Sequence, residues 1–375
     1  MKLLHTSDWH LGMSVGTKSM EEDQRFFLHQ LYKIIDEEQV DAVLCAGDIY
    51  DSSVSNAEAI AVYNDATTEI CVKRKLPFLV IAGNHDGAAR LASCRELLKE
   101  AGLFVTGRLG RDVEPVSIGD TDIYLVPFFH KEEVVALYPE YKKEITSQEK
   151  AMQVVCHQIR ENWNPQKKHI LMTHALIVNA ELSESDRSAR VGLATAVSKD
   201  VFEGFDYVAL GHIHKPQMIN EHIRYSGSPV KYSFGKEEKQ EKCVIILDTE
   251  TMEQREVPLK QLHDRRTITG TYEEIVAMEE LENDYLRLNV TDRYAGLDLL
   301  ADMQMRFPYL LELYGKSLEE NGELSAMSVE ELQTMDELAI MRKFCAETFS
   351  YEPDEEQTAL FKEVLVWSAE EADVS

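Results

Sequence analysis

Five short apolar segments of this sequence end abruptly in side chains that bind metal ions. One of them, residues 42–46, runs into Gly47-Asp48, and a short apolar run that stops at glycine is typical of a buried β-strand. The other four runs end in the same way, at Asp8 and His10, at Asn84, at His174, and at His212 and His214. Because open α/β sheets place their ligands at the carboxyl ends of strands, these side chains are expected to meet at one site.

The stretches between the first runs have the spacing of amphipathic helices. Within residues 21–39, apolar side chains recur at helical intervals, at Phe27, Leu31, Ile34 and Ile35. A second helix is expected to begin after the cap residue Asn56 and to end near Lys75, before Pro77, and a third to cover residues 90–101. Strands that alternate with helices predict a parallel sheet covered by helices, which is an α/β fold.

The rest of the first domain is expected to add strands to this architecture. We predict a strand pair around the turn Gly119-Asp120, two further buried strands, and a hairpin that closes the domain near residue 262. These strands are expected at residues 113–118, 122–126, 169–173, 206–210, 242–248 and 254–258. The loop at residues 183–190 is too polar for a core and is expected to flank the site.

Two further regions follow the first domain, which covers residues 1–262. Residues 263–325 are expected to form a small α+β domain without ligand-like side chains, with strands at 266–270 and 285–290 and helices at 272–281 and 297–306. Residues 326–375 have the pattern of acidic helices with an apolar face. That face either packs on the chain's own core or docks a partner helix or coiled coil.

Composition narrows the function classes. The 375 residues contain no apolar run near the ~18–20 residues of a membrane span, and the chain opens with a strand, so we expect no signal peptide. The six scattered cysteines form no Cys-x-x-Cys pair, which favours reduced thiols in a cytoplasmic protein. The net charge of −28 argues against nonspecific attraction of the whole surface to nucleic acid.

The residues at the strand ends are seven oxygen and nitrogen donors without sulfur: Asp8, His10, Asp48, Asn84, His174, His212 and His214. Carboxylate and imidazole donors suit Mn, Fe or Zn better than Ca or Mg alone. Seven donors exceed the needs of one ion and suit two ions that share a bridging carboxylate, for which Asp48 is the natural candidate. His85 directly follows Asn84, so it is expected to donate a proton to the leaving oxygen of a phosphoester.

Several neighbouring residues leave their roles open at this point. Asp51 and Asp86 either orient the histidines or serve the turns of their loops, and the sequence does not favour one role. The remaining histidines lack a strand-end context and are expected to be ordinary surface or core residues: His5, His29, His130, His157 and His222.

These motifs carry a family resemblance. Asp-x-His at 8–10, Gly-Asp-x-x-Asp at 47–51, Gly-Asn-His-Asp at 83–86, Thr-His at 173–174 and Gly-His-x-His at 211–214 resemble the calcineurin-like metallophosphoesterases over about residues 1–260. Within that superfamily the chain is similar to the SbcD family of bacterial nuclease subunits. The segments that carry this closer resemblance are 4–12, 46–51, 81–86, 208–217, 225–229 and 232–234.

The resemblance implies a four-layer α/β/β/α sandwich with a small α+β capping domain and C-terminal helices. It implies a Mn²⁺-dependent nuclease, a 3′–5′ exonuclease on duplex DNA and an endonuclease on single strands and hairpins, with two ions per chain. Asp8, His10, Asp48 and His214 would hold one ion, and Asp48, Asn84, His174 and His212 the other, with His85 as the catalytic histidine.

The resemblance also implies partners. Residues 263–325 would cap the DNA path, and the terminal helices would bind the coiled-coil base of the ATPase SbcC, in an assembly of two nuclease and two ATPase chains. Arg90, Lys215, Lys231 and Lys236 lie near the motif loops and are candidates to contact phosphates, although solvated surface charge is the alternative for each. The alternative functions are a phosphoesterase that acts on a small phosphodiester and a scaffold without activity.

Overall fold

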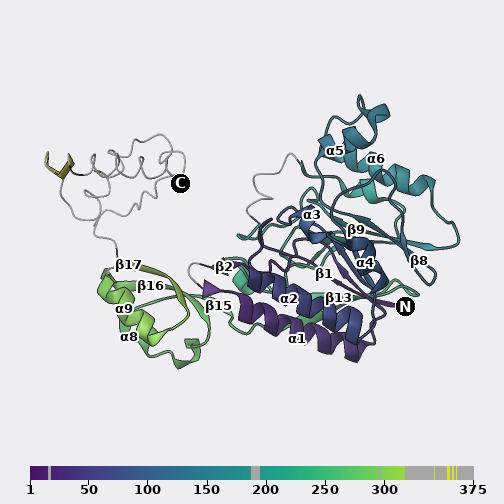
Figure 1. The fold of residues 1–375 in the computed structure, drawn as a ribbon. Coiled ribbons are helices and arrows are strands. Elements are labelled where there is room, and N and C mark those ends of the chain that lie inside the picture. The colour runs from purple at the N-terminus through teal and green to yellow at the C-terminus, as the bar shows by residue number, and fades with distance from the viewer. Residues whose placement is uncertain are drawn as a thin grey trace. The chain divides into compact units, whose positions relative to one another are not determined.

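The computed structural model describes residues 1–15, 18–186, 195–294 and 297–316, together with Arg342, Pro353, Asp354, Gln357, Thr358 and Leu360. The chain divides into two compact units, Met1–Lys316 and Ser317–Ser375. Among the described residues, the first unit contains two six-stranded sheets (Figure 1). None of the described helices is long and apolar enough to cross a membrane.

The first sheet has the strand order β14-β13-β1-β4-β5-β6. Its strands are β1 (Lys2–Thr6), β4 (Ala42–Cys45), β5 (Phe78–Ile81), β6 (Leu103–Thr106), β13 (Lys242–Asp248) and β14 (Gln254–Leu259). The strands β1, β4, β5 and β6 are parallel, whereas β13 pairs antiparallel with both β1 and β14. The carboxyl ends of β1, β4 and β5 therefore lie side by side, as the sequence predicts.

The second sheet has the strand order β11-β12-β10-β9-β8-β7. Its strands are β7 (Val116–Ile118), β8 (Thr121–Val126), β9 (Lys168–His174), β10 (Tyr207–Gly211), β11 (Gln217–Met218) and β12 (Ile223–Tyr225). The four central strands are parallel, and antiparallel strands cover both edges. Gly211 pairs with His174, so the carboxyl ends of β9 and β10 are also adjacent.

Three apolar cores hold four layers together, which confirms the predicted α/β/β/α sandwich. The core between the two sheets contains Leu3 and Leu44 of the first sheet and Ile170 of the second. On the outer face of the first sheet, Leu4 packs with residues of α1 (Glu21–Glu38) and α2 (Ala57–Thr67). On the outer face of the second sheet, Leu171 packs with residues of α5 (Lys131–Leu137) and α6 (Gln148–Glu161). Because side chains alternate along a strand, neighbours such as Leu3 and Leu4 serve different cores.

The structure differs from the sequence prediction mainly after β5. The single helix expected over residues 90–101 is two short helices, α3 (Ala88–Leu91) and α4 (Arg95–Glu100). Cys94 between them has a φ of 56°, a left-handed backbone that interrupts a right-handed helix. The strand β6 (Leu103–Thr106) and the seven-residue helix α5 (Lys131–Leu137) were not predicted.

A third, parallel sheet follows the sandwich, in the order β15-β16-β17. It consists of β15 (Arg265–Gly270), β16 (Tyr285–Tyr294) and β17 (Leu310–Lys316), and the helices α8 (Tyr272–Val276) and α9 (Leu297–Arg306) pack on it through a core of their own. The predicted alternation of strand and helix is present, although β17 was not expected. The helices predicted for residues 326–375 lie outside the described residues.

Candidate metal centre

Five loops bring the predicted ligands together at the carboxyl ends of β1, β4, β5, β9 and β10. These ligands are Asp8, His10, Asp48, Asn84, His174, His212 and His214, and all are buried except Asn84, which is partly buried. Three of the strands belong to the first sheet and two to the second. The site therefore lies at the carboxyl ends of inner strands from both sheets.

Four of these ligands have a left-handed backbone, which is uncommon for residues other than glycine. The φ angle is 54° at Asp8, 45° at His10, 50° at Asp48 and 100° at His212. Such conformations cost roughly 1–3 kcal/mol each and cluster at functional sites. Backbone hydrogen bonds between the first two loops hold them, since His10 N–H donates to the Asp48 carbonyl at 3.0 Å and Asp8 N–H to the Gly47 carbonyl at 2.9 Å.

Two glycines of the motifs are required by close approach of the loops. A Cβ atom on Gly83 would lie 2.1 Å from Asp48 Oδ1, and one on Gly211 would lie 1.9 Å from the Ala46 carbonyl oxygen. Both distances are far below van der Waals contact, so any side chain at either position would push the ligand loops apart.

Asp8, His10 and His214 form a first cluster, whose ligand atoms all lie within 4.8 Å of one another. The Nε2 atoms of His10 and His214 face each other at 3.0 Å. The Asp8 carboxylate accepts hydrogen bonds from the His212 N–H at 3.0 Å and from the Ser7 hydroxyl at 2.6 Å, which fixes its orientation.

A second cluster surrounds His174. Its Nε2 lies 3.3 Å from Asp48 Oδ2 and 3.0 Å from Asn84 Oδ1, and Nδ1 of His212 lies 2.9 Å from the same Asn84 oxygen. Asp48 also reaches the first cluster, because its Oδ2 lies 3.7 Å from Nε2 of His10. Asp48 thus stands between the two clusters, in the position expected of a bridging carboxylate.

Partners of the Nδ1 atoms set the orientation of two histidine rings. His174 Nδ1 lies 2.8 Å from the Ala46 carbonyl oxygen, which can only accept, so Nδ1 carries the proton. His10 Nδ1 lies 3.3 Å from Asp51 Oδ1, which likewise accepts when ionised. In both rings Nε2 is the nitrogen that faces the centre, where a metal ion would take the place of its proton.

The carboxylates and imidazoles of the centre shift one another's pKa values. Burial raises the pKa of Asp48, but the charges of His174 and His10 and the hydrogen bond from His174 outweigh it and hold this pKa well below its usual range. Burial lowers the pKa of His174, but the Asp48 and Asp8 carboxylates reverse the effect and raise it to about 9. Burial also lowers the pKa of His10, which its hydrogen bond to Asp51 and the nearby carboxylates raise to about 9.

The other two histidines are poor bases. Burial, together with the charge of His174, lowers the pKa of His212 to about 3, and burial with the charge of His10 holds the pKa of His214 well below its usual range. Both imidazoles are therefore neutral at physiological pH, which is the form that binds a metal ion.

His85 lies on the rim of the centre. Its backbone N–H donates to Asp48 Oδ1 at 2.9 Å, and its Nδ1 lies 2.9 Å from the Asp51 carbonyl oxygen. Because a carbonyl only accepts, Nδ1 carries a proton and Nε2 is the atom left to meet a substrate. The ring packs edge-on against His10, with 4.9 Å between the ring centroids.

The structure assigns different roles to Asp51 and Asp86, which the sequence left open. The Asp86 carboxylate accepts backbone N–H groups of Ile49 at 3.2 Å, Tyr50 at 2.9 Å and Gly83 at 2.9 Å, so it ties the loop of Asp48 to the loop that carries Asn84. The Asp51 carboxylate instead faces His10. Asp86 therefore serves the loops, and Asp51 orients a histidine.

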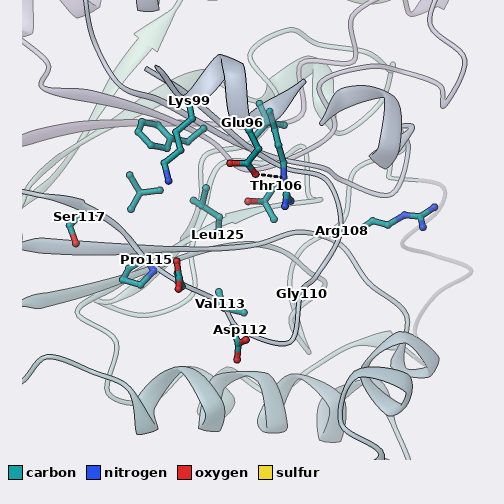
Figure 2. Close-up of a pocket in the computed structure, with 15 residues that line it drawn as sticks. Glu96, Lys99, Thr106, Arg108, Gly110, Asp112, Val113, Pro115, Ser117 and Leu125 are labelled. Atoms are coloured by element: carbon teal, nitrogen blue, oxygen red, sulfur yellow. Dashed lines mark hydrogen bonds and ion pairs between the residues drawn. The ribbon is translucent and has the colours of Figure 1, made fainter. Parts of the chain in front are cut away.

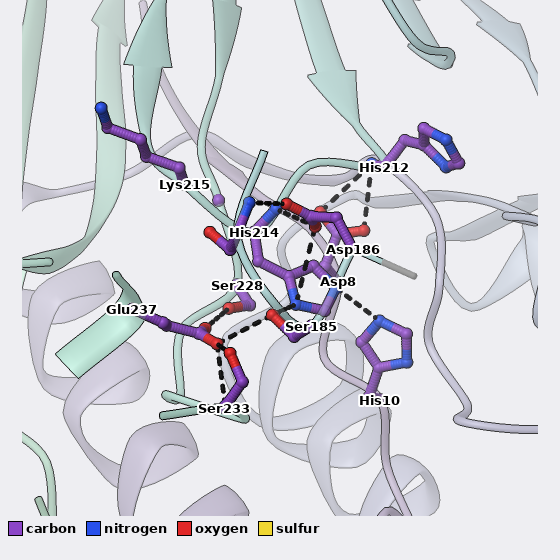
Figure 3. A network of polar contacts seen from close by, with 12 residues as sticks. Asp8, His10, Ser185, Asp186, His212, His214, Lys215, Ser228, Ser233 and Glu237 are labelled. Carbon is purple, nitrogen blue, oxygen red and sulfur yellow. Dashed lines mark hydrogen bonds and ion pairs between the residues drawn. The ribbon is translucent and has the colours of Figure 1, made fainter. Parts of the chain in front are cut away.

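Sequence reasoning missed a polar network behind His214 (Figure 3). It consists of Ser185, Asp186, Ser228, Ser233, Glu237 and Lys242. The polarity of the predicted flanking loop at 183–190 was a correct signal for the first two, as far as that loop is described. Glu237 and Lys242 gave no signal, because they lie in a highly charged stretch that has the composition of solvated surface.

Two of the basic residues proposed for phosphate contact are already engaged. Lys231 is buried and lies 2.7 Å from the Asp264 carboxylate, so it is not available to a phosphate, and Lys215 pairs with Glu181 at the surface. As expected, His5 is a core residue, hydrogen-bonded to Tyr207 at 2.9 Å.

A cavity of about 520 Å³ lies between β6 and β7, away from this chemistry (Figure 2). Arg95, Lys99 and Arg108 line it together with Glu96 and other residues. None of the predicted ligands and neither His85 nor Asp86 is among its lining residues.

The donor set fits divalent metal ions. Carboxylate, amide and imidazole donors from five loops converge on one another, and the imidazoles of His212 and His214 are neutral. Oxygen and nitrogen donors without sulfur suit ions such as Mn²⁺, Fe²⁺ or Zn²⁺. The two clusters that meet at Asp48 fit two such ions better than one.

Comparisons with known proteins point to the same chemistry. Residues 1–216 match the family model of the calcineurin-like phosphoesterases, and residues 261–349 match a model described as the type 5 capsule protein repressor C-terminal domain. The curated SbcD subunit of the nuclease SbcCD from Staphylococcus epidermidis is 30% identical over 351 residues, which is 92% of each chain, and its counterpart from Staphylococcus saprophyticus has the same values. A solved archaeal phosphodiesterase is 15% identical with a TM-score of 0.34, covering 69% of this chain and all of that one, a likeness too low to compare sites.

Proposed function

The chain belongs to the calcineurin-like phosphoesterases and, within them, to the SbcD nuclease subunits, and from this premise we propose that it hydrolyses DNA phosphodiesters with two Mn²⁺ ions. The single observation that carries the proposal is the convergence of seven oxygen and nitrogen donors in two clusters, with Asp48 3.7 Å from His10 of one and 3.3 Å from His174 of the other. We further propose a 3′–5′ exonuclease activity on duplex DNA and an endonuclease activity on single strands and hairpins.

We assign the donors to two ions by cluster. Asp8, His10, Asp48 and His214 would hold one ion, and Asp48, Asn84, His174 and His212 the other. When bound, the two ions supply an activated water and neutralise charge on the phosphate oxygens. The chain's own part is to hold the donors in place, which it does through Asp51, the Ala46 carbonyl and the loop ties of Asp86.

His85 is the proposed proton donor to the leaving oxygen. Its Nδ1–H is committed to the Asp51 carbonyl, so donation must come from Nε2, and the ring must carry protons on both nitrogens at that moment. Its backbone N–H holds Asp48 Oδ1, which fixes the ring beside the bridging carboxylate.

The proposed partners follow from the family. We propose that residues 326–375 bind the coiled-coil base of SbcC, that two chains of each kind assemble, and that residues 263–325 form the capping domain beside the DNA. The net charge of −28 supports a division of labour in which SbcC supplies much of the DNA affinity. The five described cysteines are unpaired, in keeping with our proposal that the complex acts in the cytoplasm.

The test is a nuclease assay on 3′- and 5′-labelled duplex and hairpin DNA, with Mn²⁺, in the presence and absence of SbcC and ATP. We expect His85→Ala to lose DNA cleavage while it still binds two Mn²⁺, since the change removes a proton donor and no ligand. His157→Ala, an exposed histidine on α6, is the matched control and should retain full activity. Hydrolysis of a small phosphodiester but not of DNA, even with SbcC, would favour the alternative function.

A further inference from the structure

His214 is held at three points by residues outside the ligand set. Its backbone N–H donates to Asp186 Oδ1 at 3.0 Å, its carbonyl accepts from Lys242 Nζ at 2.9 Å, and its Nδ1 lies 2.7 Å from Ser185 Oγ. Two of these three residues, Ser185 and Lys242, contact the same carboxylate, that of Glu237. Figure 3 shows Glu237 on the side of Ser185 away from His214.

The serine alone cannot fix the proton of His214. A backbone carbonyl, as at His174, only accepts a hydrogen bond, so the tautomer of that ring is settled by its partner. A hydroxyl can donate or accept, so the Ser185 contact is compatible with a proton on either nitrogen of His214. The direction of the Ser185 hydroxyl proton must therefore be set by another partner of Ser185.

The residue that orients the Ser185 hydroxyl is Glu237. Its Oε2 accepts from Ser185 Oγ at 2.8 Å and from the Ser233 N–H at 2.8 Å, and its Oε1 accepts from Lys242 Nζ at 2.7 Å. The side chains of Glu237 and Lys242 are both fully buried, so a carboxylate and an ammonium face each other there. Burial raises the pKa of Glu237, but the charge of Lys242 outweighs it and lowers the pKa to about 2.

An ionised carboxylate has no proton to give, so Ser185 donates its single hydroxyl proton to Glu237. The serine oxygen is then left to accept from His214, whose proton must sit on Nδ1. The Nε2 lone pair consequently faces His10 and Asp8 in the first metal cluster. We propose that Glu237 is a positioning residue, which acts through Ser185 to keep the proton of His214 on Nδ1 and its Nε2 lone pair toward the metal.

This inference rests on the proposed two-metal site, because His214 must be a ligand for its tautomer to matter. The chain offers a matched pair of variants. Ser185→Ala removes the link between Glu237 and His214. Ser233→Ala removes a different hydroxyl from the same Oε2 atom but leaves the link to His214 in place. A role of this network in folding alone would make the two variants alike.

The experiment uses the full-length chain, stripped of metal, and has two readouts. Isothermal titration with Mn²⁺ measures the affinity and number of the sites. Long-range ¹H–¹⁵N NMR of histidine-labelled protein reports the tautomer of His214, whose signals are assigned by their absence from the spectrum of H214Q.

We expect the Nδ1–H form of His214 in the wild type, a roughly 10–100-fold loss of affinity at one of two Mn²⁺ sites in S185A, and a change of less than about twofold in S233A. The Nε2–H form in the wild type would overturn the proposal, as would equal affinities of S185A and S233A. If S185A does not fold, the wild-type tautomer still decides. If the wild type takes up no Mn²⁺ at all, the proposed two-metal function fails. The tautomer of His214 still tests, independently, whether Glu237 acts through Ser185.

Discussion

The buried pair of Glu237 and Lys242 should be tightly coupled in stability. Both side chains have 0% exposure and their charged atoms lie 2.7 Å apart. Replacing one partner leaves the other as an uncompensated buried charge, which costs about 3–5 kcal/mol. We expect Glu237→Gln to lower the free energy of unfolding by about 3 kcal/mol, at the low end of this range. The loss is limited because Lys242 keeps the Ser228 hydroxyl at 3.0 Å and the Gln240 side chain at 3.2 Å as acceptors. That is a large part of a typical stability of about 5–15 kcal/mol.

The double variant Glu237→Gln with Lys242→Met removes both charges and should recover most of this loss, to within about 0–2 kcal/mol of the wild type. The assay is urea unfolding of the full chain at pH 7.5 in a chelator, so that bound metal does not contribute. Glu37→Gln breaks an exposed ion pair with Lys33 and should have almost no effect. Additive losses in the double variant would refute the coupling.

The pH dependence of this loss has a definite sign. The pKa of Glu237 is lowered from 4.5 to about 2 in the folded chain, so its ionised form is favoured by folding. The stabilisation is present above the unfolded pKa and is lost as the pH falls toward the folded pKa. The difference between wild type and Glu237→Gln should therefore shrink below about pH 4. A difference that stays constant down to pH 3 would contradict this assignment.

Three further predictions follow from the site. Asp51→Ala should weaken Mn²⁺ binding by about 10–100-fold with little change in urea unfolding, since the Asp51 carboxylate orients His10 and, among the described residues, accepts no backbone N–H. The pKa values of His10 and His174 are raised to about 9 in the metal-free chain, so Mn²⁺ must displace their protons when it binds. The affinity for Mn²⁺ should therefore rise with pH up to about 9. The released protons should be measurable by calorimetric titration in buffers of different ionisation enthalpy. A chain that ends near residue 325 should keep Mn²⁺ binding and lose co-purification with SbcC, and retained co-purification would show that the partner binds elsewhere.

The sequence could predict the ligand loops because a parallel sheet has few ways to end. A buried strand carries its polar side chains mostly at its end, and four of the five runs change from apolar to ligand residues within two positions. The register of β9 with β10, which places His174 opposite Gly211, then follows from pairing two such strands. Composition and periodicity were enough for this part of the fold.

The same reasoning could not find Glu237 and Lys242. They stand in the segment Lys236-Glu237-Glu238-Lys239-Gln240-Glu241-Lys242, where Glu and Lys alternate in small groups without apolar neighbours. Such a segment favours a solvated surface, since charged residues are seldom fully buried unless paired. Burial here depends on tertiary contacts with Ser185, Ser228 and Ser233, which are distant or uninformative in the sequence. The break at Cys94 was missed for a related reason, because a left-handed backbone at a non-glycine residue has no local signal.

The left-handed backbone at Asp8, His10, Asp48 and His212 and the charge pair behind His214 are two parts of one physical arrangement. At roughly 1–3 kcal/mol each, these four conformations oppose folding by an amount comparable with the stability of a whole domain. They persist because Asp86 and the backbone bonds between loops fix the main chain, and because Asp51, Ala46 and Glu237 fix the rings. Ligands held so firmly before a metal arrives lose little freedom when it binds. The strained backbone is therefore the cost of a site whose geometry is set by the protein and not by the ion.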